Sequence, residues 1–212
     1  SKHFQFICWK TAYEEMRKSS LLGGFHFLQF ADTDAYENSN GVVDCFDDET
    51  CVKPADFLKF NGDRVLIAEL KTRNYFCADE IIVPVYFSNL GEDTEKRANL
   101  AVSVEKNGKK YVDCSMKNVD VSRKGSYRLC KTKLTLPKEA GVYVLKIKLT
   151  TKSEVYSENE WTLWIYDRPA KQETYGEFVS YDNGREAITD DIEKAFDLLE
   201  KGKRVCLVYR SG

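Results

Sequence analysis

The sequence predicts a mainly β fold centred on a two-layer antiparallel β-sandwich at residues 65–168. Apolar and polar residues alternate there with a period of two, as in half-buried strands. The clearest run places four apolar residues on one face and two lysines on the other: Tyr143, Leu145, Ile147 and Leu149 against Lys146 and Lys148. The dipeptide Asn107-Gly108 predicts a hairpin, because a type I′ turn needs positive φ at both central positions. Roughly seven short strands at about 8–12-residue spacing are typical of an immunoglobulin-like sandwich.

The other predicted strands show the same alternation. Their apolar faces are Ile81, Val83, Val85 and Phe87; Leu100, Val102 and Val104; Cys130, Thr132, Leu134 and Leu136; and Trp161, Leu163 and Ile165. Pro84 cannot donate a ladder hydrogen bond, so we expect it at a sheet edge or a bulge. Trp161 and Trp164 fall on opposite faces, so at most one of them belongs to the core. Four lysines are expected to form one basic, solvated outer face: Lys131, Lys133, Lys146 and Lys148.

The region before the sandwich has helical periodicity. An amphipathic helix is predicted over residues 8–19 from the spacing of Trp9, Ala12, Tyr13 and Met16. Gly23-Gly24 follows and is expected to stop it. Glu14 and Glu15 lie on this helix and are expected to face solvent.

A strand and a second helix are predicted next. Residues 25–31 are apolar on both faces apart from His26 and Gln29, as expected for a parallel strand covered on both sides. The polar stretch 32–40 has the composition of a loop. Pro54 suits the first turn of a helix, and Asn61-Gly62 ends that helix. Its expected apolar face consists of Phe57, Leu58 and Phe60.

After a polar linker at residues 170–184, the sequence predicts the start of an α/β unit. Asp190 can cap a helix, with Glu193 completing a capping box three residues later. The apolar stripe of that helix is Ile192, Ala195, Phe196 and Leu199, and Gly202 ends it. Residues 204–209 then have the pattern of a buried strand.

The composition restricts the classes of function. The chain has 42% hydrophobic residues, and 32 Lys and Arg nearly balance 34 Asp and Glu, so we expect packed cores and no nucleic-acid partner. No apolar run approaches the roughly 20 residues that cross a bilayer, and we expect no membrane partner and a cytoplasmic location. The seven cysteines show no CxxC pair, which favours reduced thiols over a disulfide framework or a zinc site. No metal or cofactor is predicted.

Three stretches before the sandwich carry a resemblance to a known family. They are Gly23-Gly24-Phe25 and the apolar run up to Asp32, the stretch from Asn40-Gly41 to Asp44, and the proline-opened segment Lys53 to Phe57. In this order they resemble the last strand, long loop and last helix of the catalytic (β/α)8 barrel in family 2 glycoside hydrolases, the β-galactosidase and β-glucuronidase group. The run Gln5 to Lys10 resembles the preceding barrel helix.

The resemblance implies a domain organisation. Residues 1–64 would be the last elements, helix, strand and helix, of a (β/α)8 catalytic barrel. Residues 65–168 would be the sandwich that follows the barrel in this family, and residues 169–212 a linker and the start of a C-terminal α/β domain. Both catalytic glutamates of the family end strands four and seven, which would precede residue 1. No catalytic residue is therefore assigned, and the chain alone is expected to be inactive.

The resemblance also implies candidate substrate-binding residues at the end of the eighth barrel strand. Phe27 stands where better-known members have a tryptophan that lines the sugar site, although core packing is the competing interpretation. Gln29, Asp32 and Asp34 could hydrogen-bond sugar hydroxyls, with helix capping or loop solvation as the alternative for the first two.

Two functional hypotheses follow. The chain would be part of a retaining β-glycoside hydrolase that acts on carbohydrate, with a second copy of the chain as one way to cover its exposed barrel segment. Alternatively, it would be a non-catalytic carbohydrate-binding or structural immunoglobulin-like module. A contiguous exposed aromatic strip on the sandwich would favour carbohydrate binding, whereas fully buried aromatics would favour a scaffold.

Overall fold

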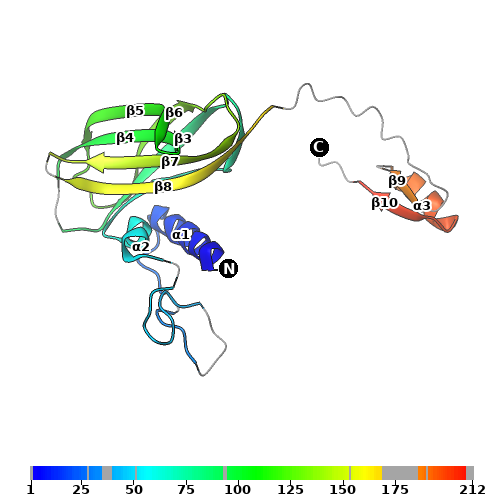
Figure 1. The fold of residues 1–212 in the computed structure, drawn as a ribbon, viewed down its shortest axis with the longest axis horizontal. Coiled ribbons are helices and arrows are strands. Elements are labelled where there is room, and N and C mark those ends of the chain that lie inside the picture. The colour runs from blue at the N-terminus through cyan, green and yellow to red at the C-terminus, as the bar shows by residue number, and fades with distance from the viewer. Residues whose placement is uncertain are drawn as a thin grey trace. The chain divides into compact units, whose positions relative to one another are not determined.

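A computed structural model gives the fold of the chain (Figure 1) and describes residues 2–27, 29–34, 40–50, 52–92, 95–152, 154–168, 186–189 and 191–208. These residues belong to two compact units, Ser1–Asp167 and Arg168–Gly212. The predicted linker at 170–184 and the predicted cap Asp190 lie outside the described residues.

Eight strands of the first unit form two sheets. They are β1 (Arg64–Ala68), β2 (Asn74–Phe76), β3 (Glu80–Asn89), β4 (Arg97–Lys106), β5 (Lys109–Asp120), β6 (Gly125–Thr135), β7 (Gly141–Thr150) and β8 (Val155–Tyr166). One sheet has the order β1-β3-β6 and the other β2-β8-β7-β4-β5. The pairs are antiparallel except β2 with β8. The mainly β fold and the sandwich are thus confirmed.

The core lies between the two sheets and has the predicted register. Tyr143, Leu145, Ile147 and Leu149 are buried, together with Phe87, Leu134 and Trp161. Lys146 and Lys148 point the other way and pair with Glu105 at 2.9 Å and Glu158 at 3.2 Å. A slip of one residue would bury both ammonium groups, which fixes the register of β7.

The predicted hairpin is confirmed, whereas Pro84 lies beside a bulge and not in it. Asn107 and Gly108 have φ of 52° and 77° and connect β4 to β5. Pro84 lies in the central strand β3, one residue before the register shift between Val85 and Tyr86. Its carbonyl accepts a hydrogen bond from Glu69 N at 2.9 Å.

The predicted basic face is wrong. Lys131 and Lys133 belong to β6 in the three-stranded sheet, whereas Lys146 and Lys148 belong to β7 in the five-stranded sheet. The chain changes sheets between β6 and β7. Alternation within a strand gives its inward face but not the sheet it joins, so the sequence could not separate the two pairs.

Two helices, α1 (Lys2–Lys18) and α2 (Pro54–Asn61), lie along one side of the sandwich, below β8 in Figure 1. Pro54 opens α2 at its first turn, as predicted. Aromatic rings from both helices and the segment after α1 pack together at centroid distances of 4.6–6.4 Å: Phe6, Trp9, Tyr13, Phe25, Phe27, Phe57 and Phe60. No helix within the described residues has the length and apolarity to span a bilayer.

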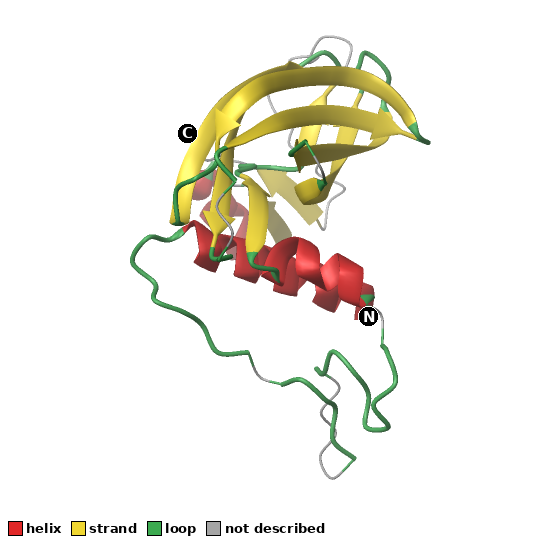
Figure 2. Cartoon of the chain, turned by 90° about the vertical axis from the view of Figure 1, so that its left-hand side faces the viewer, coloured by secondary structure: helices red, strands yellow, loops and turns green. Residues whose placement is uncertain are grey.

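The expected barrel strand at residues 25–31 is not formed. Among the described residues of this stretch, only Ala31 makes a β-bridge, to Val43. The segment runs below α1 as a loop (Figure 2), and Phe25 and Phe30 are 38% and 68% exposed. A parallel strand is held by hydrogen bonds to neighbouring strands. The described part of the chain contains no strand that pairs with this segment.

The second unit is a small β-α-β arrangement. It contains β9 (Glu186–Thr189), α3 (Ile192–Glu200) and β10 (Arg204–Leu207), with β9 and β10 paired in parallel. Strand β9 was not predicted. The side chain of Asp191 accepts hydrogen bonds from Glu193 N and Lys194 N, so the N-cap is one residue later than expected. Strand β10 is largely exposed rather than buried, and of the predicted stripe on α3 only Ala195 is buried.

Candidate functional site

A buried polar cluster joins α1 to the sandwich. Glu14 is only 5% exposed, so the prediction that it faces solvent is wrong. Its carboxylate accepts hydrogen bonds from Lys10 Nζ, from Asn159 Nδ2 at 2.8 Å and from Trp161 Nε1 at 2.9 Å. Asn159 also donates to Leu66 O at 2.7 Å. Helix α1, β1 and β8 therefore meet at one satisfied network.

The network is structural in character. Burial lowers the pKa of Lys10, against the attraction of Glu14, and its ammonium also lies 4.6 Å from the centre of the Trp161 ring. Three donors occupy the carboxylate of Glu14, which leaves it poorly suited to transfer protons to a substrate. The signal in the sequence was Asn159, a polar residue at an inward position of β8 that requires a buried partner.

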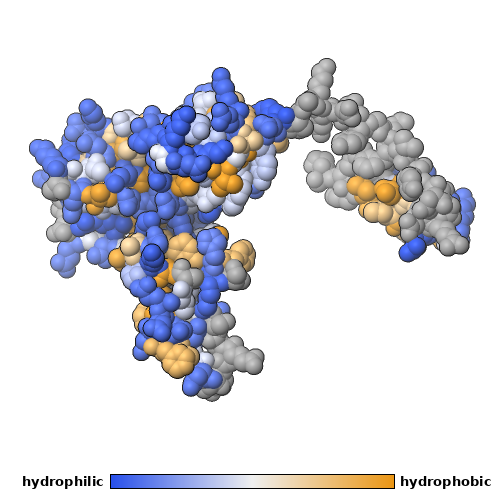
Figure 3. All heavy atoms as spheres, viewed as in Figure 1, coloured by the Kyte–Doolittle hydropathy of each residue, from blue (hydrophilic) through white to orange (hydrophobic). Residues whose placement is uncertain are grey.

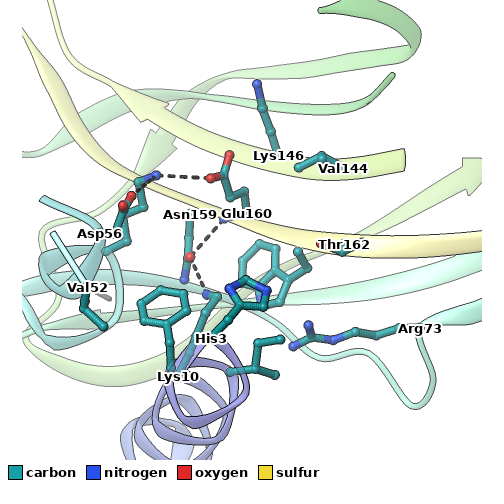
Figure 4. A pocket seen from close by; sticks show the side chains of 14 residues that line it. His3, Lys10, Val52, Asp56, Arg73, Val144, Lys146, Asn159, Glu160 and Thr162 are labelled. Carbon is teal, nitrogen blue, oxygen red and sulfur yellow. Dashed lines mark hydrogen bonds and ion pairs between the residues drawn. The ribbon is translucent and has the colours of Figure 1, made fainter. Parts of the chain in front are cut away.

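An open pocket of about 440 Å³ lies beside this network (Figure 4). The N-terminal half of α1 contributes His3 and Lys10, α2 contributes Asp56 and Lys59, and β7 and β8 contribute further side chains. Arg73, from the segment before β2, also lines it. The lining thus combines cations, carboxylates and the Trp161 ring.

Two carboxylates of the pocket share one ammonium group. Lys59 Nζ lies 3.0 Å from Asp56 Oδ1 and 3.2 Å from Glu160 Oε1. Burial lowers the pKa of Lys59, but its hydrogen bonds to both carboxylates outweigh burial and raise it overall. Retaining glycoside hydrolysis needs one carboxyl group that donates a proton and one free to attack the sugar. Because Lys59 bridges Asp56 and Glu160, this pair supplies neither the proton donor nor the free nucleophile.

An aromatic strip adjoins the pocket on the outer face of the five-stranded sheet. We define it as Phe76, Val142, Trp164 and Tyr166, of which the three aromatic residues are 41%, 37% and 50% exposed in that order. Phe76 pairs with Tyr166 across β2 and β8, and Val142 pairs with Trp164 across β7 and β8. The next outward residues on β7 and β8, Val144 and Thr162, line the pocket.

The prediction that Trp161 and Trp164 lie on opposite faces of their strand is confirmed. Trp161 is buried in the core, whereas Trp164 on the other face of β8 is partly exposed. Figure 3 shows apolar side chains at the surface among the mostly hydrophilic residues of the first unit. Phe76 was missed because β2 has three residues and no alternation to detect.

The structure places the candidate substrate-binding residues of the N-terminal region apart from this pocket. Phe27 packs edge-on against Trp9, with ring centres 5.4 Å apart, within the aromatic cluster of the helices. Gln29 Nε2 is buried and has no hydrogen-bond partner among the described residues. Asp34 is exposed.

Asp32 stabilises its own loop through a hydrogen bond and an ion pair. Its Oδ1 accepts a hydrogen bond from Gly41 N at 2.5 Å, and its Oδ2 pairs with Lys2 at 3.2 Å. The Gly41 hydrogen bond is the main cause that lowers the pKa of Asp32, and Lys2 adds to it. A Cβ atom on Gly41 would collide with the backbone of Asp32 and Val43, which explains the glycine.

Comparisons with known proteins give weak likenesses in structure. No protein-family model and no curated protein sequence matches the chain. The CARDB domain of PF1109 from Pyrococcus furiosus matches with 13% identity over 50% of this chain and 92% of that one, at a TM-score of 0.37. Spo0M from Bacillus subtilis matches with 12% identity over 51% of each chain, also at 0.37.

A Parabacteroides merdae β-glucuronidase matches with 17% identity over 49% of this chain and 13% of that one, at a TM-score of 0.32. Likenesses this weak do not identify a family, and the resemblance to family 2 glycoside hydrolases is not confirmed by them. The sandwich is established by the two sheets themselves.

Proposed function

We propose that this chain is a non-catalytic part of a protein that acts on β-linked carbohydrate, and that its sandwich contacts the sugar. The observation that carries this proposal is the aromatic strip and its continuity with the pocket of about 440 Å³. Exposed rings aligned across neighbouring strands are the feature that distinguishes a carbohydrate-binding face from a scaffold whose aromatics are all buried.

The chemistry of the two surfaces is complementary to a sugar. The apolar faces of Trp164, Tyr166 and Phe76 suit the C–H face of a pyranose ring. The adjoining pocket offers charged hydrogen-bonding groups, among them Arg73 and Glu160, within reach of hydroxyl groups. Stacking on the strip and hydrogen bonding in the pocket would thus orient one chain of linked sugars along β8.

The wider proposal is that the parent protein is a retaining β-glycoside hydrolase. The exposed apolar side chains of Leu21, Phe25 and Phe30 support it, because a barrel or a second copy of the chain would cover them. Phe27, Gln29, Asp32 and Asp34 remain its proposed sugar contacts.

A cytoplasmic location is part of the same proposal and is supported by six free thiols: Cys8, Cys45, Cys77, Cys114, Cys130 and Cys206. Cys51 lies outside the described residues.

Calorimetric titration with soluble β-linked oligosaccharides tests the binding proposal. Tyr166→Ala should weaken binding about threefold to tenfold, which corresponds to roughly 0.5–1.5 kcal/mol of stacking. Tyr111→Ala is the matched control, because Tyr111 is also exposed but lies on β5, at the opposite edge of the same sheet. Equal affinities for the two variants, or no binding by the unaltered chain, would reject the strip as a sugar site and favour a structural module.

A further inference from the structure

A second pocket, of about 300 Å³, lies at the other end of α1. The last turn of α1, the segment 19–25 and the adjacent ends of β3 and β6 enclose it. None of its lining residues belongs to the first pocket or to the aromatic strip. It is therefore a separate feature of the first unit.

The lining of this pocket is basic and rich in hydroxyl groups. Its charged residues are Arg17, Arg123 and Lys124, and no carboxylate is among the lining residues. Ser88 and Ser126 contribute hydroxyl groups. A concave surface with three cations and no acid has the electrostatic character of an anion site.

Arg17 is the decisive residue because it is buried without a counter-ion. It is 9% exposed, and among the described residues its side chain makes one hydrogen bond, from Nη1 to Ser88 Oγ at 3.3 Å. Within the described part of the chain, its buried Nε has no hydrogen-bond partner, and no carboxylate lies within ion-pair distance of the guanidinium. Burial lowers the pKa of Arg17, and the more distant charge of Asp63 opposes this. A buried guanidinium in this state requires an anionic partner.

A second buried group in the same pocket lacks a partner. Ser126 Oγ is buried and has no hydrogen-bond partner among the described residues. Ser126 and Arg17 come from distant parts of the sequence and line one cavity. Two unpartnered donors that line one cavity indicate a missing acceptor rather than two separate packing faults.

We propose that this pocket binds a compact oxyanion, a phosphate or sulfate group. The guanidinium fork of Arg17 would donate to two oxygens at once, and Ser126 Oγ would donate to a third. Arg123 and Lys124 would supply the remaining charge from the rim, where Arg123 lies 5.1 Å from the centre of the Tyr127 ring. The volume exceeds that of a bare ion, so the pocket also accommodates part of a small molecule that carries the group.

The test is titration of the full chain with sodium phosphate, sodium sulfate and glucose 6-phosphate, with chloride at the same ionic strength as the blank. Saturable binding that chloride does not reproduce is expected, with a rise in melting temperature. Tighter binding of the ester than of free phosphate would identify an organic phosphate as the ligand, and equal binding would identify the free ion; either supports the proposal. Absence of saturable binding by all three would overturn it.

Three variants assign the binding to this pocket. Arg17→Gln should weaken phosphate binding at least tenfold. Since Arg17 is buried and this variant could unfold, Arg123→Gln combined with Lys124→Gln, two exposed positions, should weaken binding several-fold in a folded chain. Lys138→Gln, at an exposed position outside the pocket, is the control. Unchanged affinity in the double variant would show that the oxyanion binds elsewhere.

Discussion

The sandwich and the segment 19–50 are neighbours in sequence but differ in how they acquire structure. Strand β7 has partners on both sides, β4 and β8, and its apolar face is completely buried. The segment 19–50 has comparable apolar content near its start, yet its described residues form only isolated bridges, and Phe30 is 68% exposed. Apolar sequence becomes a strand only where the same chain supplies the hydrogen-bond partners.

Replacement of Glu14 should change the free energy of unfolding most, because this residue attaches α1 to the sandwich. Glu14→Ala would leave Lys10 as a buried charge without its carboxylate, so we expect a loss of about 3–5 kcal/mol in the free energy of unfolding. Glu15→Ala, one position away and exposed, should stay within about 0.5 kcal/mol. Chemical denaturation of both variants measures the difference.

A combined replacement separates charge from packing. Lys10→Met together with Glu14→Leu should recover a large part of the loss, because a buried ion pair can often be exchanged for apolar residues. If Glu14→Ala proves as mild as Glu15→Ala, α1 is not anchored through this carboxylate.

The comparison of the two regions can be tested directly with one large-to-small substitution in each. Leu145→Ala, in the core of the sandwich, should cost about 2–5 kcal/mol through lost burial and a residual cavity. Phe30→Ala, in the exposed segment, should change the free energy of unfolding by less than about 0.5 kcal/mol. A cost above 2 kcal/mol for Phe30→Ala would mean that the segment is packed in solution.

Two glycines, one in the sandwich and one in the segment 19–50, should show a smaller difference in the free energy of unfolding. Gly108 has φ of 77° in the β4–β5 hairpin, so Gly108→Ala should cost about 1–2 kcal/mol. Gly24 lies in the segment after α1 with open space around it, and Gly24→Ala should be neutral or slightly stabilising. Thermal unfolding compares them. Equal losses would show that the backbone at Gly24 is as constrained as the hairpin.

A further effect concerns pH. Burial is the main cause that raises the pKa of Tyr127 to about 12, from an ordinary value of 10.0. The folded chain thus holds this proton more tightly than the unfolded one. The stabilisation is fully present below pH 10 and is lost as pH rises through about 12. Tyr127→Phe should flatten the alkaline slope of the unfolding free energy relative to the unaltered chain, and an unchanged slope would contradict the raised pKa.

The sequence predicted the sandwich well because alternation is local. The inward set of β7, the Asn107-Gly108 hairpin and the helix opened by Pro54 all depend on neighbours a few residues apart.

The features that the sequence could not predict depend on distant partners. Glu14 is buried by Asn159 and Trp161, which lie 145 and 147 residues away along the chain. The aromatic strip needs Phe76, whose short strand β2 joins the edge of β8. The second pocket arises only when the end of α1 meets β3 and β6. In each case the residue types were visible, but the element against which they pack was not.

We propose that this chain contacts carbohydrate without cleaving it. The most direct test incubates the purified chain with a panel of aryl β-glycosides and with the oligosaccharides used for titration, and follows release of the aryl group and of reducing sugar. We expect binding without turnover, since Glu14 is fully hydrogen-bonded and Asp56 and Glu160 share Lys59. Turnover that co-elutes with the chain would show that an active site lies within these residues.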